Sequence, residues 1–192
     1  DPDLDQMLFY LPLSGSSFKK VYYDSTRGRA VSKFIPSEEL IVPYTATDLA
    51  TAERVTHVLK RTENDIRKLQ VTGFYRDVDL EEYEAPETNS IQEQINRMDG
   101  VKETGSGYKN DQYTLLEIHV DLDLPGFEDR DGIKLPYIVT IDEGSGNVLS
   151  IYRNYDENDS LKKKKQYFVH YKFLPGLGFY GYGLIHMLGG LS

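Results

Sequence analysis

Apolar and polar residues alternate along much of the chain, which is the pattern of half-buried β-strands. Residues 17–23 and 30–35 alternate on the two sides of a short connection that ends at Gly28, and this arrangement predicts a β-hairpin. Residues 40–42 form a brief apolar run. Residues 54–61 are rich in β-branched side chains and predict a longer strand. The first third of the chain is therefore expected to be largely extended.

The second half of the chain predicts four consecutive strands. Residues 113–124 alternate, and we expect one face of this strand to pack on the core and the other to lie in solvent. The expected core face holds Leu116, Ile118, Val120, Leu122 and Leu124, and the expected solvent face holds Glu117, His119, Asp121 and Asp123. Residues 135–142 and 147–155 flank a Glu-Gly-Ser-Gly turn, and residues 166–173 add a fourth strand. Four such strands in a row predict one antiparallel sheet.

Two helices are predicted in the first half of the chain. Apolar side chains recur at helical spacing over residues 3–11. Asp3 is expected to be the N-cap of this helix, and Pro12 is expected to end it. The second helix follows Thr62, whose spacing to Asp65 is that of a capping box. Gly73 is expected to supply the left-handed residue at its C-terminal end.

A further capping box, Ser90 with Glu93, predicts a third short helix through Met98. The preceding residues, 77–89, carry six acidic side chains and predict a solvated connector. Residues 156–165 include four consecutive lysines and predict a solvated loop, with contact to phosphates or to an acidic partner as the alternative.

These elements predict an α+β fold, made mainly of antiparallel hairpins and sheet with two or three short helices. Residues 1–174 form the β-rich domain, and residues 175–192 form a glycine-rich, aromatic segment that leads into the start of a helix. No charged side chain follows Lys172, and an apolar tail of this kind is not expected to lie in water. We therefore expect a piece of a larger protein whose tail contacts other subunits. The candidate interface residues are Phe173, Leu177, Phe179, Tyr180, Tyr182, Leu184, Ile185, Met187 and Leu188.

Composition argues against several classes of protein. The net charge of -9 opposes a dedicated nucleic-acid-binding module, because DNA phosphates are repelled. The absence of cysteine excludes disulfides, thiolate zinc sites and a cysteine nucleophile. No apolar stretch approaches the roughly 20 residues that span a bilayer, so no membrane contact is expected.

Candidate chemistry is sparse. The acidic residues between Asp121 and Asp131 offer carboxylates to a hard cation, but their spacing is not that of a calcium loop, and an exposed strand edge with an acidic turn is the simpler interpretation. The four histidines are not spaced as neighbouring ligands, and Ser145 lies in the predicted hairpin turn. Residues 176–181 spell Gly-x-Gly-x-x-Gly but follow antiparallel strands, so they predict a bend with close backbone packing. No catalytic residue, cofactor or metal is predicted.

Five stretches of the chain, in order, resemble the portal proteins of tailed bacteriophages, particularly those of short-tailed phages and their prophage relatives. The stretches are SFKKVYYD, RAVSKFIPSEELIVPYTATDL, ERVTHVLKRTENDIRKLQVTGFYRDVDL, YIVTIDEGSGNVLSIYRNY and FLPGLGFYGYGLIHMLGGLS. Together they cover half of the chain. The last stretch resembles the point in portals where a β-rich wing region ends and a long helix begins.

The resemblance implies a structural, non-enzymatic virion subunit, assembled as a ring of about twelve copies at one capsid vertex. Such rings pass double-stranded genome DNA without sequence specificity, dock the packaging terminase and later hold the tail or its adaptor proteins. The chain would be a wing portion that contributes ring contacts. It would assemble in the host cytoplasm before it belongs to the virion, and its acidic charge fits a conduit through which DNA slides.

Two other functions are open. A β-rich binding or adhesion module of a phage tail or cell surface would stack sugars on its tyrosines, in an aromatic-lined groove of a self-sufficient monomer. A metal-dependent hydrolase or nuclease would need at least three convergent carboxylates. The portal interpretation predicts instead an exposed apolar surface around residues 173–191 and no deep polar pocket.

Overall fold

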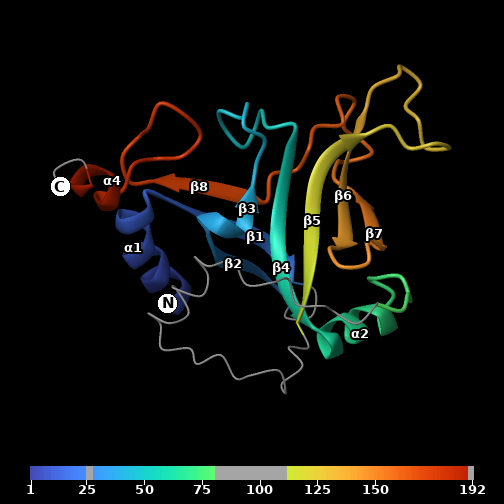
Figure 1. Cartoon of the computed structure of the whole chain (residues 1–192). Helices are drawn as coiled ribbons and strands as arrows, with labels where there is room; N and C mark the ends of the chain where they lie inside the picture. The colour runs from blue at the N-terminus through green and yellow to red at the C-terminus, as the bar shows by residue number, and fades with distance from the viewer. Residues whose placement is uncertain (25–27, 81–111, 190–192) are drawn as a thin grey trace.

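The computed structural model describes residues 1–24, 28–80 and 112–189, and they form an α+β fold of two antiparallel sheets with short helices (Figure 1). The predicted fold class is therefore confirmed. The elements are α1 (Pro2–Ser14), β1 (Ser16–Asp24), β2 (Arg29–Pro36), the 3-10 helix η1 (Ser37–Glu39), β3 (Leu40–Ile41), β4 (Arg54–Thr62), α2 (Glu63–Val71), β5 (Gln112–Leu122), β6 (Leu135–Asp142), β7 (Val148–Arg153), β8 (Phe168–Lys172) and α4 (Leu184–Leu188).

The strands divide into a small sheet of order β2-β1-β8 and a large sheet of order β3-β4-β5-β6-β7. The strands of the small sheet run across those of the large one (Figure 1). The prediction of one sheet from the last four strands is right for β5, β6 and β7 and wrong for β8. The long β7–β8 connection carries the chain to the small sheet, where β8 pairs with β1 from Ser16 opposite Lys172 to Lys20 opposite Phe168.

The main core lies between the two sheets. Its buried side chains are Phe18, Ile35, Leu40, Leu49, Ala52, Val55, Phe168 and Phe179. Phe18 is fully buried, which stabilises the fold by about 2–3 kcal/mol relative to an exposed ring. Smaller clusters lie under α2, around Ile66 and Leu115, and on the other side of the large sheet, around Leu135 and Tyr137. The two sheets are thus held mainly by side chains from strands distant in sequence.

Helix α1 differs from the prediction at both ends. Its N-cap is Asp1, whose carboxylate accepts from the backbone N–H of Asp3 at 3.2 Å, so the helix begins earlier than expected. It continues past Pro12 to Ser14. A proline in the last turn removes only one helical hydrogen bond, and Gly15 ends the helix instead with a φ of 84°, donating to the carbonyl of Leu11 at 2.9 Å.

The predicted caps of α2 and the predicted β6–β7 turn are confirmed. The hydroxyl of Thr62 accepts from the backbone N–H of Asp65 at 3.3 Å and caps α2, and Gly73 follows the helix with a φ of 74°. The turn between β6 and β7 is closed by Asp142, whose carboxylate accepts from the backbone N–H and the hydroxyl of Ser145. The helix predicted through Met98 and most of the acidic connector lie outside the described residues.

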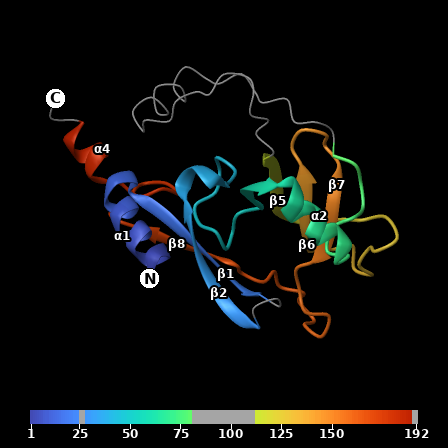
Figure 2. The same ribbon diagram turned by 90° about the horizontal axis from the view of Figure 1, so that it is seen from below.

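Helices α1 and α4 lie together at one end of the molecule, and α2 lies with β6 and β7 at the other (Figures 1 and 2).

Candidate functional site

The tail segment that the sequence marks as an interface returns to the body of the protein before it forms α4. Leu174 forms an isolated antiparallel bridge with Tyr182, which folds the intervening residues into a loop. Eight of the nine candidate interface side chains are exposed, and Ile185 reaches 63% exposure. The structure therefore places most of these apolar side chains in solvent.

Phe179 is the exception among the candidate interface residues, because the structure places its ring in the core. It is only 6% exposed and belongs to the main core. Its ring stacks on His170 at a centroid distance of 4.8 Å and on Phe18 at 5.9 Å. The loop folds back over the small sheet, so this one aromatic side chain points inward.

Close backbone packing of glycines holds α4 against α1, and the Gly-x-Gly-x-x-Gly segment, which predicts such packing, contributes Gly181 but not Gly183. A Cβ atom on Gly183 would lie 2.2 Å from the carbonyl oxygen of Leu13, and a Cβ on Gly181 would lie 2.5 Å from that of Gly15. The backbone N–H of Gly181 also donates to the hydroxyl of Ser16 at 2.8 Å. Only glycine permits this approach, and the contact fixes α4 on the first helix.

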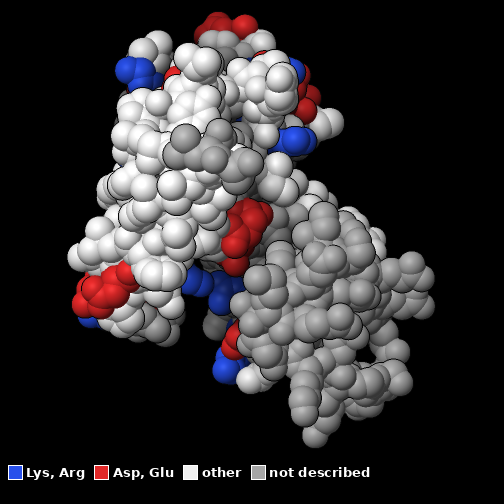
Figure 3. Space-filling model, turned by 60° about the vertical axis from the view of Figure 1, so that its left-hand side comes forward, with Lys and Arg blue, Asp and Glu red and all other residues white. Residues whose placement is uncertain are grey.

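Together, α1 and the tail form one exposed apolar surface, which we call the terminal apolar face. Its residues are Leu4, Leu8, Phe9, Leu13, Phe173, Leu174, Leu177, Tyr180, Tyr182, Leu184, Ile185, Met187 and Leu188. No charged residue occurs between Phe173 and Gly189. Figure 3 shows this side of the molecule, where a broad uncharged area is bordered by acidic and basic side chains, with one acidic group near the middle of the view. The sequence marked the tail half of this face but not the contribution of α1, because α1 was expected to bury its leucines.

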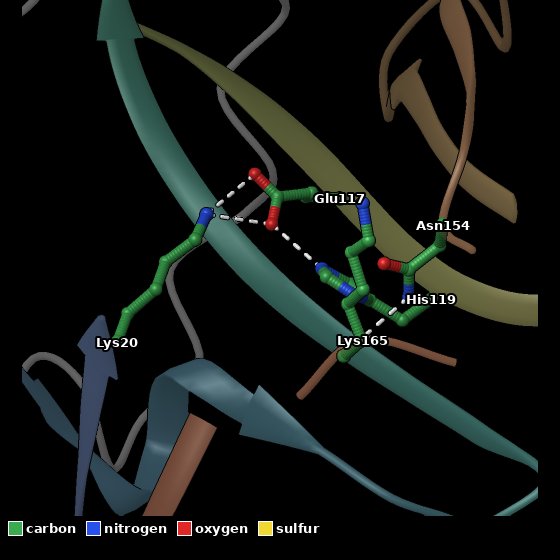
Figure 4. A network of polar contacts seen from close by, with 5 residues as sticks. All are labelled: Lys20, Glu117, His119, Asn154 and Lys165. Atoms are coloured by element: carbon green, nitrogen blue, oxygen red, sulfur yellow. Dashed lines mark hydrogen bonds and ion pairs between the residues drawn. The ribbon is translucent and has the colours of Figure 1, made fainter. Parts of the chain in front are cut away.

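A second constellation was missed from the sequence and lies between the sheets (Figure 4). Lys20 on β1 places its Nζ 2.6 Å from both carboxylate oxygens of Glu117 on β5. Nε2 of His119 lies 2.8 Å from Oε1 of the same carboxylate. A carboxylate only accepts hydrogen bonds, so Nε2 carries the hydrogen. The ion pair joins the small sheet to the large one.

This finding corrects the predicted orientation of β5 at Glu117 and His119, whereas Asp121 and Asp123 are exposed as predicted. Leu115 and His119 are buried and Glu117 is only 15% exposed, although the last two were expected in solvent. The apolar side chains of the opposite face, such as Ile118 and Val120, are only partly buried. The reason is that the small sheet covers the Glu117 face and brings Lys20 to neutralise it, from a strand 97 residues earlier.

The electrostatics of the network follow from burial and from its internal partners. Burial alone would raise the pKa of Glu117, but the hydrogen bond from His119 and the charge of Lys20 outweigh it and lower the pKa to about 2. His57, directly opposite Glu117 on β4, is buried and has a pKa of about 3, because burial and the charge of Lys20 disfavour its protonation. Its Nδ1 contacts no hydrogen-bond partner among the described residues. At neutral pH, Glu117 is therefore charged and His57 is neutral.

The space beside this network limits its chemistry. The hollow that His119 lines, together with Asn154 and Lys165, has a volume of about 20 Å³, enough for one water molecule. The side-chain amide of Asn154 donates to the carbonyl of Lys165 at 3.2 Å and helps to close this hollow (Figure 4). The Glu117–His119 pair resembles an acid–base pair in composition, but this hollow is too small for a substrate. The arrangement is suited to holding the two sheets together.

The acidic residues between Asp121 and Asp131 contact the lysine-rich loop of residues 156–165. Asp129 forms an ion pair with Lys162, and Nζ of Lys164 donates to the carbonyl of Ala52 at 2.8 Å. The loop is therefore partly fastened to the protein, whereas the sequence predicted a fully solvated one.

Within the described ranges, no group of three His, Cys, Asp or Glu side chains is placed to hold a metal ion. An open hollow of about 480 Å³ lies between these segments, lined by both lysines and aspartates.

Comparison with protein families finds no model that matches the chain, and comparison with curated protein sequences finds no match. Across the part of the chain that is described, no helix has the length and apolar character needed to cross a bilayer.

Proposed function

We propose that this chain is part of the subunit of a viral portal ring and that its role is structural and non-enzymatic. The ring would stand at one capsid vertex, pass double-stranded DNA during packaging and ejection, and dock the terminase and later the tail or adaptor proteins. The subunit would assemble in the host cytoplasm and remain in the virion.

The terminal apolar face is the observation that carries this proposal. A surface with many exposed large apolar side chains, and without charged residues in its tail half, is unusual for a protein that stays monomeric, and such surfaces generally mark contacts with other proteins. The face is fixed to the body by the Gly183 contact, so it is presented as a rigid surface. The five sequence stretches that resemble portal proteins favour further copies of the same chain as the partner.

The interior of the protein is consistent with a structural role. The described residues that are most distinctive chemically, Lys20, Glu117 and His119, are buried and satisfied by one another. They face no space of substrate size. We therefore assign them to the stability of the fold and the function to the surface.

Light scattering and negative-stain imaging of the full-length polypeptide that contains these residues test the proposal. Rings of about twelve copies with a central channel are the expected result. Combining Ile185→Asp with Leu188→Asp should abolish the rings without changing the circular dichroism spectrum, because both side chains are well exposed. Tyr44→Asp, at a fully exposed loop position, is the matched control and should leave the rings intact.

A monodisperse monomer at every salt concentration would contradict the proposal. In that case the adhesion module becomes the better interpretation, and a glycan screen is the next experiment.

A further inference from the structure

The hollow beside His119 lies where β5 meets the two ends of the β7–β8 connection. His119 lines it from β5, and Asn154 and Lys165 line it from the start and the end of that connection. The backbone N–H of Lys165 donates to the carbonyl of Asn154 at 2.9 Å, so the two ends are fastened to each other. The hollow is therefore a junction between the large sheet and the lysine-rich loop.

Asn154 is the residue that points to an occupant of this hollow. Its side chain is buried, and the orientation of its amide is fixed, because only Nδ2 can donate to the carbonyl of Lys165. The other atom of the amide, Oδ1, is also buried and contacts no hydrogen-bond partner among the described residues. A buried acceptor without a donor is unfavourable, and buried polar atoms in native proteins nearly always have a partner. A hydrogen-bond donor is therefore expected beside Oδ1.

His119 supplies a second acceptor next to Asn154 (Figure 4). Its Nε2 donates to Glu117, so Nδ1 carries no hydrogen and can only accept. Two acceptors that line one hollow select an occupant with two hydrogens to donate. A volume of about 20 Å³ holds one water molecule. Further polar side chains line the hollow at Asp121 and Gln166, as a water site requires.

We infer that the hollow is a binding site for one ordered water molecule, which donates one hydrogen to Oδ1 of Asn154 and the other to Nδ1 of His119. This water completes a chain of hydrogen bonds from Lys20 on β1, through Glu117 and His119 on β5, to Asn154 and Lys165. It also fixes the tautomer of His119 that donates to Glu117, because a donor at Nδ1 leaves no room for a hydrogen on that nitrogen. The site lies in the interior and does not depend on the proposed ring.

A crystal structure of the full-length polypeptide, at a resolution that shows ordered water, tests the site. The expected result is one density peak in the hollow, about 2.7–3.2 Å from both Oδ1 of Asn154 and Nδ1 of His119. If the map shows ordered water elsewhere in the interior but none here, the inference is overturned. It is also overturned if rubidium replaces the peak in crystals soaked in rubidium chloride, because anomalous scattering would then identify a monovalent cation site.

Magnetic relaxation dispersion of water counts the long-lived internal water molecules in solution. Asn154→Leu should lose one of them relative to the wild-type polypeptide, because leucine removes the acceptor and fills part of the hollow. Asn158→Leu makes the same exchange at an exposed position of the lysine-rich loop and should keep the wild-type count. Equal counts in Asn154→Leu and the wild type would contradict the inference. If Asn154→Leu does not fold, the density at the wild-type site decides the question by itself.

Discussion

Replacing Lys20 by methionine tests the idea that a buried ion pair holds the two sheets together. The substitution keeps most of the volume of the side chain but removes the charge that lies 2.6 Å from both oxygens of Glu117. The pKa of Glu117 is about 2, against 4.5 for a free side chain, so folding favours its charged form by about 3 kcal/mol. This contribution is present above pH 4.5 and is lost as the pH falls towards 2. Because Glu117 would retain only His119, we expect Lys20→Met to lower the free energy of unfolding at pH 7 by about 3 kcal/mol.

Urea unfolding followed by circular dichroism measures this loss. Lys33→Met is the matched control, since Lys33 lies opposite Lys20 in the β1–β2 register but is exposed, and it should change stability by less than about 0.5 kcal/mol. Adding Glu117→Leu to Lys20→Met should restore much of the stability, because an apolar pair leaves no unpaired buried charge. The reasoning is refuted if Lys20→Met and its control lose the same amount, or if the second substitution adds a further loss of similar size.

Three further predictions address the core, the pH dependence and the glycine contact. Phe179→Ala should lose at least about 3 kcal/mol of stability in urea unfolding, because its ring fills the main core. Leu177→Ala, at a fully exposed position nearby, should lose less than about 0.5 kcal/mol; equal losses would contradict the placement of Phe179. His57 takes up a proton below pH 6.5 when unfolded but only near pH 3 when folded, so this histidine alone should cost the wild-type protein about 2 kcal/mol between pH 7 and pH 5. His57→Leu should remove this part of the pH dependence, and an unchanged slope would argue against it. Gly183→Ala should release α4 from the body at a loss of about 2 kcal/mol, seen as faster amide exchange in α4. Gly178→Ala, where a Cβ meets open space, should leave that exchange unchanged.

Local structure was largely predictable because its signals lie within a few residues. Thr62 and Asp65 mark the start of α2 by one hydrogen bond between them, and the turn after Asp142 is closed by a serine three positions later. The glycine segment was interpretable for the same reason, since its spacing implies a bend. The end of α1 was missed because Pro12 is a weaker signal in a last turn than Gly15 with its left-handed backbone.

The assembly of the sheets was not predictable in the same way. The polar face of β5 signals solvent unless a distant residue compensates its charge, and no local pattern announces that Lys20 does so. The pairing partner of β8 could not be predicted for the same reason. Both β1 and β7 have an edge to which β8 could add, and the choice depends on how Phe168 packs in the core with Phe18. The inward turn of Phe179 follows from that choice. The sequence predicted the tail half of the terminal apolar face, because the tail carries no charged residue. It did not predict the half that α1 contributes.

The contact between Gly181 and Ser16 has a consequence for how the chain acquires its structure. The two residues lie 165 positions apart, whereas β5, β6 and β7 follow one another through short connections. Contacts over long separations form late and slow folding. The large sheet is therefore expected to form first, while the β1–β2 hairpin waits for β8 with one edge open. During synthesis that edge is exposed until β8 has left the ribosome. A substitution in the tail that delays the pairing of β8 would then keep the edge of the N-terminal hairpin open for longer. The visible result would be aggregation of nascent chains.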